Sequence, residues 1–328
     1  MPTSSRSTKT TKSTTSISSK QKVILDCDPG HDDAFAIMFA AKHCELLGIT
    51  SVSGNVGLPL TTHNTLLMTQ LLNLDVPVHA GAAGPMIGVA THAPDIHGKT
   101  GLGGPKLPKL TRELASNNAV QFIIDTVRNV DDVWLIAVGP LTNVALAIRQ
   151  APDIVKRLQG ISIMGGSNSF GNRTPAAEFN TYADPEAADV VFSSGVKNLY
   201  MCGLNLTHQF KLGMSEVAAM QKMKNNGVAK FYGELLEFFL STYSNRFGVL
   251  EAPMHDVCAV LAVTHPDVIR FEPRHVDVEL RGEHTRGMTL VDERDFQNVR
   301  LEQNAQVGLS IDRKKGIKLL LDAVEKYS

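Results

Sequence analysis

Four carboxylates fall within eight residues near the start of the chain: Asp26, Asp28, Asp32 and Asp33. Like charges this close together repel, and a folded chain tolerates them only when a cation lies among them. Carboxylate oxygens are hard ligands, which favour Ca²⁺ or Mg²⁺ over zinc. The cluster therefore predicts a divalent metal site.

The residues around the cluster indicate which elements carry it. Val23–Cys27 is an apolar, β-branched stretch typical of a buried parallel strand, and a Pro-Gly turn follows it. Apolar residues then recur at helical spacing from Ala34 to Ala41. Asp32 could serve only as a helix cap, but capping needs one carboxylate and four are present. Since α/β sheets place ligands at such strand-to-helix turns, we expect the metal at the edge of an active site.

The run D-C-D-P-G-H-D-D-A, Asp26 to Ala34, resembles the D-x-D-P-G-x-D-D-A signature of the nucleoside hydrolases. The resemblance extends from about Lys22 to the C-terminus, and one motif alone would be only suggestive. Six further stretches follow in the order of the family: Ser53–Val56, His97-Gly98, Gly139–Asn143, Met164–Gly166, Asn172 through Glu178–Glu186, and His255-Asp256.

This resemblance implies a Ca²⁺ ion held by Asp28, Asp33, Asp256 and the backbone carbonyl of Val138. A divalent ion lowers the pKa of its bound water and can orient the water and the sugar hydroxyls. By position in the motif, Asp32 is expected to be the general base that takes a proton from this water.

The resemblance also implies residues that bind the ribose hydroxyls, namely Asn55, Asn172, Glu178 and Asn180. Amides and carboxylates suit this task because together they donate and accept hydrogen bonds. Asn55 by itself would be weak support, because Ser-Gly-Asn is a common turn. The polar stretch that starts at Glu178 is more informative, since it interrupts an apolar pattern just before a helix.

Three further residues are expected on the side of the departing base. His255, beside Asp256, is the candidate general acid, because histidine can protonate a leaving base near neutral pH. The resemblance implies that His97 lies near the base and the sugar. It also implies that Tyr243 belongs to a mobile flap over the base, although an aromatic residue at this spacing could equally be core.

The single tryptophan bears on the base preference. Trp134 lies in the apolar run Val133–Val138 and is expected in the core. Purine-restricted members of the family stack the base on tryptophans, and this chain has no other. The expected substrates are therefore pyrimidine or mixed ribonucleosides, such as uridine and inosine, cleaved to ribose and free base for nucleoside salvage.

Strand-like and helix-like segments alternate along the chain, which predicts a single-domain α/β fold: a mostly parallel, Rossmann-like sheet flanked by helices. The alternating pattern of Val276–Leu301 predicts a small antiparallel hairpin, and Gly308–Tyr327 a closing helix. Residues 1–22 are rich in Ser, Thr and Lys and are expected to be a disordered tail. Residues 23–328 form the predicted catalytic domain. Asp184-Pro185 is expected to start a helix and to have no catalytic role.

The composition of the chain limits the classes of partner that we expect it to bind. A net charge of −1 over 328 residues offers no field for nucleic acid, and no apolar stretch is long enough to cross a membrane. The four cysteines form no C-x-x-C pair, which favours reduced thiols in a cytoplasmic protein. The expected partner is a small ribonucleoside. We expect a homodimer or homotetramer, although no sequence feature determines the oligomeric state.

Two other functions compete with this hypothesis. Phosphatases of the haloacid-dehalogenase type also place D-x-D after a strand and bind Mg²⁺, but their mechanism does not use the later pair Asp32-Asp33. A nucleoside- or sugar-binding protein that has lost catalysis would not need Asp32, Asp33 and Asp256 together.

Overall fold

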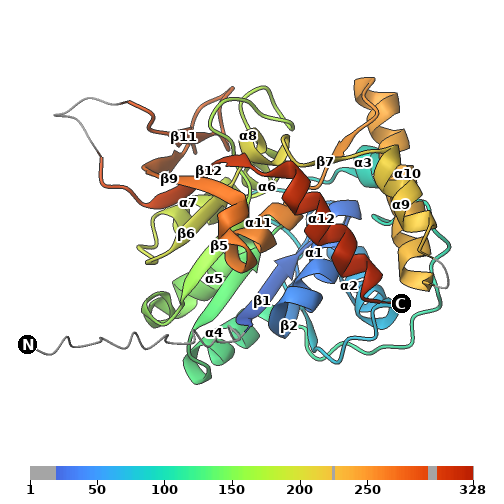
Figure 1. Cartoon of the computed structure of the whole chain (residues 1–328). Coiled ribbons are helices and arrows are strands. Elements are labelled where there is room, and N and C mark those ends of the chain that lie inside the picture. Colours follow the sequence, from blue (N-terminus) through green and yellow to red (C-terminus); the bar gives the residue numbers. More distant parts are fainter. Residues whose placement is uncertain (1–19, 224–225, 295–300, 328) are drawn as a thin grey trace, which may run out of the picture.

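A computed structural model describes residues 20–223, 226–294 and 301–327. At its centre lies a twisted sheet of eight strands (Figure 1). Each neighbouring pair is parallel except the last, in which β9 runs antiparallel to β12. The predicted mostly parallel α/β sheet is confirmed. In spatial order the strands are β3 (Val78–Ala80), β2 (Cys44–Ser51), β1 (Gln21–Cys27), β4 (Val133–Ala137), β5 (Gly160–Met164), β6 (Leu199–Cys202), β12 (Ala305–Ile311) and β9 (Ile269–Arg274).

The central strands are apolar because helices cover both faces of the sheet, so side chains on either side of each strand are buried. All five residues of β4 and of β5 are buried. Trp134 in β4 is 7 % exposed and stacks on Tyr200 of β6. The expectation that the tryptophan belongs to the core is therefore confirmed.

Two apolar cores separate the helices into two layers, one on each face of the sheet (Figure 1). One core contains residues of α1 (His31–His43), α2 (Leu58–Leu71), α9 (Met214–Gln221), α10 (Gly227–Phe247), α11 (His255–Thr264) and α12 (Arg313–Glu325). The other contains residues of α4 (Ala119–Asn129), α5 (Thr142–Gln150) and α7 (Pro185–Phe192).

The strand order reverses beside β1, which pairs with β2 on one side and β4 on the other. Backbone hydrogen bonds continue both pairings past the strand ends: Val52 donates to the carbonyl of Cys27, and Val138 to that of Asp26. Such a reversal opens a crevice at the carboxyl ends of the strands. The carboxylate-rich turn after β1 lies at this crevice.

Short elements surround the crevice. They are α3 (Pro94–His97), α6 (Phe179–Ala183), α8 (Leu204–Thr207), and the paired strands β7 (Lys211–Leu212) and β8 (Ala252–Pro253). Asp184 is the N-cap of α7, where it accepts a hydrogen bond from the backbone of Ala187. The predicted helix start at Asp184-Pro185 is confirmed.

Two predicted boundaries need correction. β1 begins at Gln21, so the last two residues assigned to the tail belong to the first strand; residues 1–19 lie outside the described part of the chain. The closing helix begins at Arg313, because Gly308–Ile311 pair with β9 inside β12. Small and apolar residues such as these occur both in helices and in strands. Only the observed pairing with β9 shows that they form a strand.

The predicted hairpin is confirmed where it is described. β10 (Val276–Val278) pairs antiparallel with β11 (Thr289–Val291). Residues 295–300, within the predicted segment, lie outside the described residues. Sequence reasoning missed that the flanking strands, β9 and β12, join the central sheet. Within the described residues, no helix is long and apolar enough to span a membrane.

Candidate active site

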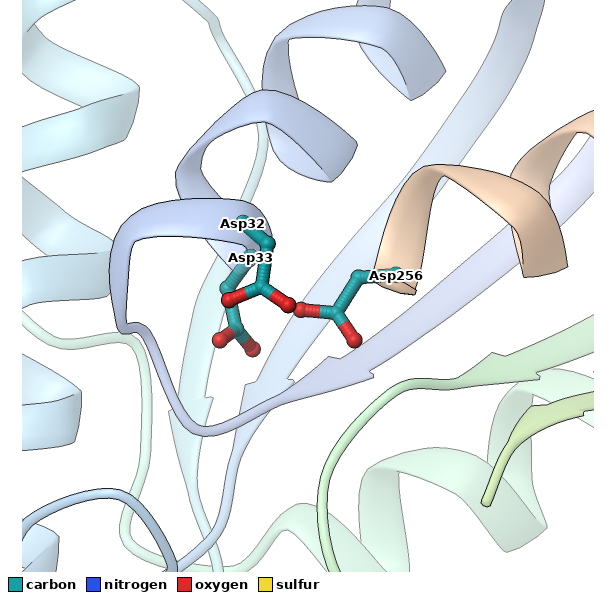
Figure 2. Close-up of side chains that lie close together, drawn as sticks. All are labelled: Asp32, Asp33 and Asp256. Atoms are coloured by element: carbon teal, nitrogen blue, oxygen red, sulfur yellow. The ribbon is translucent and has the colours of Figure 1, made fainter. Parts of the chain in front are cut away.

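Three buried carboxylates meet at the crevice. Asp32 and Asp33 lie in the first turn of α1, and Asp256 lies in the first turn of α11. One carboxylate oxygen from each lies within 4.8 Å of the others, and the three side chains point toward one another (Figure 2). Both helix N-termini favour negative charge here, but two partial charges do not neutralise three carboxylates.

Backbone and amide groups hold Asp33 in place. Its carboxylate accepts hydrogen bonds from the backbone of Asp28 at 3.0 Å and of Gly30 at 2.9 Å, and from the amide of Asn55 at 3.1 Å. The bond from Gly30 is a helix-capping bond. Capping, which the sequence allowed for Asp32, is therefore done by Asp33, and Asp32 is left facing the cavity.

Asp28 lies directly beside this group. Its Oδ2 accepts a hydrogen bond from the backbone of Asn55 at 2.6 Å, whereas its buried Oδ1 has no hydrogen-bond partner. A Cβ built on Gly54 would come within 2.0 Å of Oδ2, so only glycine permits this approach. A buried carboxylate oxygen without a donor is what a bound cation would satisfy.

Asp26 does not join the group. Its Oδ1 accepts hydrogen bonds from the Thr50 hydroxyl and from the amide of Asn143, at 2.7 Å from the latter. The same amide donates to the carbonyl of Ser51. Asp26 thus ties the ends of β1 and β2 to the start of α5. Of the four carboxylates in the run from Asp26 to Asp33, Asp26 is structural and the other three lie at the site. Asp256 is the fourth carboxylate of the site.

The electrostatics of the group fit a cation. Burial, reinforced by the charge of Asp33, raises the pKa of Asp32 to about 8. Burial raises the pKa of Asp28 and Asp256 well above the usual range, and neighbouring carboxylates raise them further. Carboxylates in such surroundings ionise together only when positive charge is supplied. Four acidic side chains and a nearby backbone carbonyl form an all-oxygen set that suits a hard divalent ion.

Two members of the acidic group, Asp32 and Asp256, form the floor of a cavity of about 420 Å³. Asp28 and Asp33 belong to the same group but do not line the cavity. The structure brings the other ten predicted site residues to the cavity wall: Asp32, Asn55, His97, Val138, Asn172, Glu178, Asn180, Tyr243, His255 and Asp256.

One wall is built from polar residues of α6 and the loop before it. Glu178 caps α6, and its carboxylate accepts hydrogen bonds from the backbone of Gly166, Asn180 and Thr181. The amide nitrogen of Asn180 donates to the carbonyl of Val138 at 2.8 Å, which fixes the orientation of the predicted carbonyl ligand.

Asn172 lies at the mouth of the cavity. It is exposed, and its side-chain oxygen accepts a hydrogen bond from the backbone of Phe179 at 2.9 Å. This bond ties the loop to the start of α6. Asn172 therefore lines the cavity, but its side chain is more exposed and makes fewer hydrogen bonds than those of Glu178 and Asn180.

The opposite wall carries the predicted base-side residues. The Nδ1 of His255 lies 2.7 Å from the hydroxyl of Thr207, and its Nε2 lies 3.4 Å from the hydroxyl of Tyr243. Burial lowers the pKa of His255 to about 3, so the ring is neutral. Nδ1 of His97, which also lines the cavity, accepts a hydrogen bond from the backbone of His31 at 3.2 Å.

Sequence reasoning missed several residues of this wall: Asp95, Phe170, Arg173, His208, Lys211 and Arg246. A signal existed for His208 and Lys211, because they follow β6 at the same sheet edge as the acidic group. Phe170 and Arg173 lie on a loop, Asp95 in the short helix α3 and Arg246 at the end of α10, where no pattern in the sequence indicates orientation.

Comparison with known proteins agrees with this geometry. Residues 23–318 match the family model described as inosine-uridine preferring nucleoside hydrolase. The chain belongs to this family of nucleoside hydrolases. It is therefore an enzyme, an N-glycosyl hydrolase.

Relatives of this nucleoside hydrolase cover nearly the whole chain. It is 43 % identical over 296 residues to the pyrimidine-specific ribonucleoside hydrolase RihB of Escherichia coli strain K12, covering 89 % of this chain and 93 % of the relative. A purine-preferring ribonucleoside hydrolase from Gardnerella vaginalis has a similar solved structure, with a TM-score of 0.87, 30 % identity, and coverage of 94 % and 99 %. The plant nucleoside hydrolase PpNRh1 superposes with a TM-score of 0.85 at 29 % identity, covering 93 % and 99 %.

The carboxylate group predicts how stability depends on pH. With the pKa of Asp32 raised to about 8, the metal-free folded state holds a proton that the unfolded state has lost, so stability falls as pH rises toward 8. Buried histidines act in the opposite direction only below about pH 6.5, where the unfolded state becomes protonated. We expect chelated protein to lose about 1–2 kcal/mol of unfolding free energy between pH 6.5 and 8.

Urea denaturation of chelator-treated protein at several pH values measures this slope, and saturating Ca²⁺ should remove it. A metal-free protein whose stability stays flat or rises over this interval would contradict the electrostatic account of the site. The variant Asp32→Asn, which carries no titrating group at this position, is the matched control and should show a reduced slope.

Proposed function

We propose that this enzyme hydrolyses the N-glycosidic bond of pyrimidine ribonucleosides, with uridine preferred and inosine accepted, in a Ca²⁺-dependent reaction that serves nucleoside salvage. The single observation that carries the proposal is the acidic group of Asp32, Asp33 and Asp256, two of which, Asp32 and Asp256, form the floor of a nucleoside-sized cavity. The pyrimidine preference rests on 43 % identity to a hydrolase named for pyrimidine specificity and on the burial of Trp134 in the core, away from the cavity.

The proposed ligands of the ion are Asp28, Asp33, Asp256 and the carbonyl of Val138. When bound, Ca²⁺ would lower the pKa of a coordinated water and orient it toward the sugar. The unpartnered Oδ1 of Asp28 supports this assignment. Asp32 is free of the capping bond that occupies Asp33, faces the cavity, and would take the proton of the attacking water.

Ribose would be held by the amides and carboxylates that line the cavity. Asn55, Glu178 and Asn180 are buried and already oriented by hydrogen bonds to the backbone, so little ordering remains to be done on binding. Asn172 would reach the sugar from the mouth of the cavity. Positive charge that develops on the sugar in the transition state would face the acidic floor.

His255 would assist the departing base. When the hydroxyl of Thr207 donates to Nδ1, the ring proton lies on Nε2, the atom next to Tyr243 and the cavity. A neutral imidazole in this tautomer can donate a hydrogen bond from Nε2 to the base as negative charge grows on it, and the base would take its proton from solvent. His97 and Tyr243 complete this side of the cavity, where the base would be held.

We further propose a homodimer or homotetramer and a cytoplasmic location. The four free, buried cysteines of the described residues support a reducing compartment.

A panel of ribonucleosides tests the function. Purified protein incubated with uridine, cytidine and inosine in buffer without phosphate should release free ribose and free base, fastest from the pyrimidines. Release of ribose without added phosphate excludes a phosphorylase, and hydrolysis of a phosphate ester instead would support the phosphatase alternative. A protein that binds uridine but releases no ribose would be a binding protein.

The roles of the carboxylates are separable by substitution. Asp32→Asn should leave Ca²⁺ content near one per chain but lower kcat by about 10²–10⁴-fold, because a positioned acid-base group contributes this much. Asp33→Asn and Asp256→Asn should lose the ion as well. Elemental analysis and ribose release, measured on the same samples, show which variants lose the ion and which lose only activity. Identical behaviour of all three variants, or zinc in the wild-type protein, would refute the assignment.

The role of His255 depends on the leaving group. His255→Ala should slow hydrolysis of inosine far more than that of a nitrophenyl riboside, since nitrophenolate leaves without a proton. Because Asp256 is adjacent, Ca²⁺ content must be measured on the same preparation. Equal losses on both substrates, with the ion retained, would show that His255 orients the sugar or the loop instead.

A further inference from the structure

The base side of the cavity carries a lysine for which the proposed mechanism has no use. Lys211, in β7, and His208, just before it, line the cavity with His255. β7 pairs with β8 so that Lys211 lies opposite Pro253, two residues before His255. The ring of His208 lies between Phe170 and His255, with centroids 5.1 Å and 5.5 Å away.

The charge of Lys211 has no counterpart. Within the part of the chain that the structure describes, its ammonium group makes no hydrogen bond or ion pair. The acids at the mouth of this cavity are already paired, Asp95 with Arg246 and Glu251 with Arg313. Glu178, deeper in the wall, is occupied by backbone donors.

Lys211 is partly buried, and a partly desolvated cation without an anion is unfavourable. Its charge also helps burial to hold the pKa of His208 below its usual range. An arriving group that carries negative charge would be stabilised here.

The reaction itself produces such a group. As the bond between C1′ and N1 of uridine breaks, its electron pair stays on the base and spreads onto the adjacent carbonyl oxygen. The water oxygen bonds to C1′ and its proton passes to Asp32, while the base later takes a proton from solvent. A cation fixed at that carbonyl stabilises the transition state more than the substrate, whose carbonyl is neutral.

We propose that Lys211 contacts the departing base, donating a hydrogen bond from its ammonium to a ring carbonyl oxygen and so favouring bases that leave as oxo-anions. This inference rests on the proposed function. It assigns the uracil preference to a cationic contact on the base side, in a wall that His208 and Phe170 complete.

Two uridines that differ only in leaving-group acidity test the contact. 5-Fluorouracil leaves more readily than uracil and depends less on outside stabilisation. Lys211→Met should lower kcat/KM for uridine by about 10- to 100-fold, the usual effect of losing a hydrogen bond to a charged group. The loss on 5-fluorouridine should be several-fold smaller. Lys211→Arg, which keeps the charge, should recover most of the activity on uridine.

Lys156→Met is the matched control, because Lys156 is exposed and does not line the cavity. It should match the wild type on both substrates. Thermal melting of each variant checks the fold, and single-turnover measurements ensure that bond cleavage is observed.

The outcomes separate the two proposals. An equal loss of kcat/KM on both substrates, or no loss, would overturn the role of Lys211 while leaving the hydrolase intact. A wild-type protein that releases no ribose from uridine would overturn both.

Discussion

Repulsion among buried carboxylates is the interaction on which the rest of the site depends. Asp28, Asp32, Asp33 and Asp256 are all buried, and burial raises their pKa values. Neighbouring carboxylates raise the pKa values of Asp28, Asp32 and Asp256 further. No arginine or lysine contacts the group among the described residues. A fold that keeps such a cluster at neutral pH requires either protons or a cation, and the all-oxygen set selects a hard divalent ion. The raised pKa values therefore indicate a site that needs a positive charge, which the protein chain itself does not supply.

The scaffold meets this constraint with rigid elements. Parallel strands end at one edge of the sheet, so β1 and β4 deliver Asp28 and Val138 to the same crevice. The N-termini of α1 and α11 add Asp32, Asp33 and Asp256 with favourable dipoles. Asn143 and Asp26, below the site, join the strand ends by buried hydrogen bonds. Asn143 and Asp26 therefore position the strand ends that carry the site, because neither residue lines the cavity.

The two sides of the cavity differ in charge. Its floor and one wall are acidic or amide-rich, which suits a sugar that gains positive charge as the bond breaks. The other wall carries neutral histidines, aromatic rings and Lys211, which suits a base that gains negative charge. In the proposed binding mode, cleavage of the N-glycosidic bond separates charge along this axis. Each wall is then complementary to the charge that develops on one of the two fragments.

The sequence alone determined the order of alternating elements and the carboxylate signature. These features are local or repeat at short spacing: the apolar runs of β1, β4 and β5 are legible because helices cover both faces of the sheet. The family resemblance added residues that are far apart in the chain, such as Asn55 and His255, which no spacing argument could have joined.

Only the tertiary structure decided which carboxylates share the site and which residues complete the base side. Asp26 and Asp28 look equivalent in sequence, yet one bonds with Asn143 and the other joins the acidic group, because Asp26 lies inside β1 and Asp28 follows its end. Gly308–Ile311 could extend a helix but pair as a strand, since cross-strand contacts outweigh local propensity. The unpaired charge of Lys211 is equally invisible in sequence, because a partner is missing only once every neighbour has been placed.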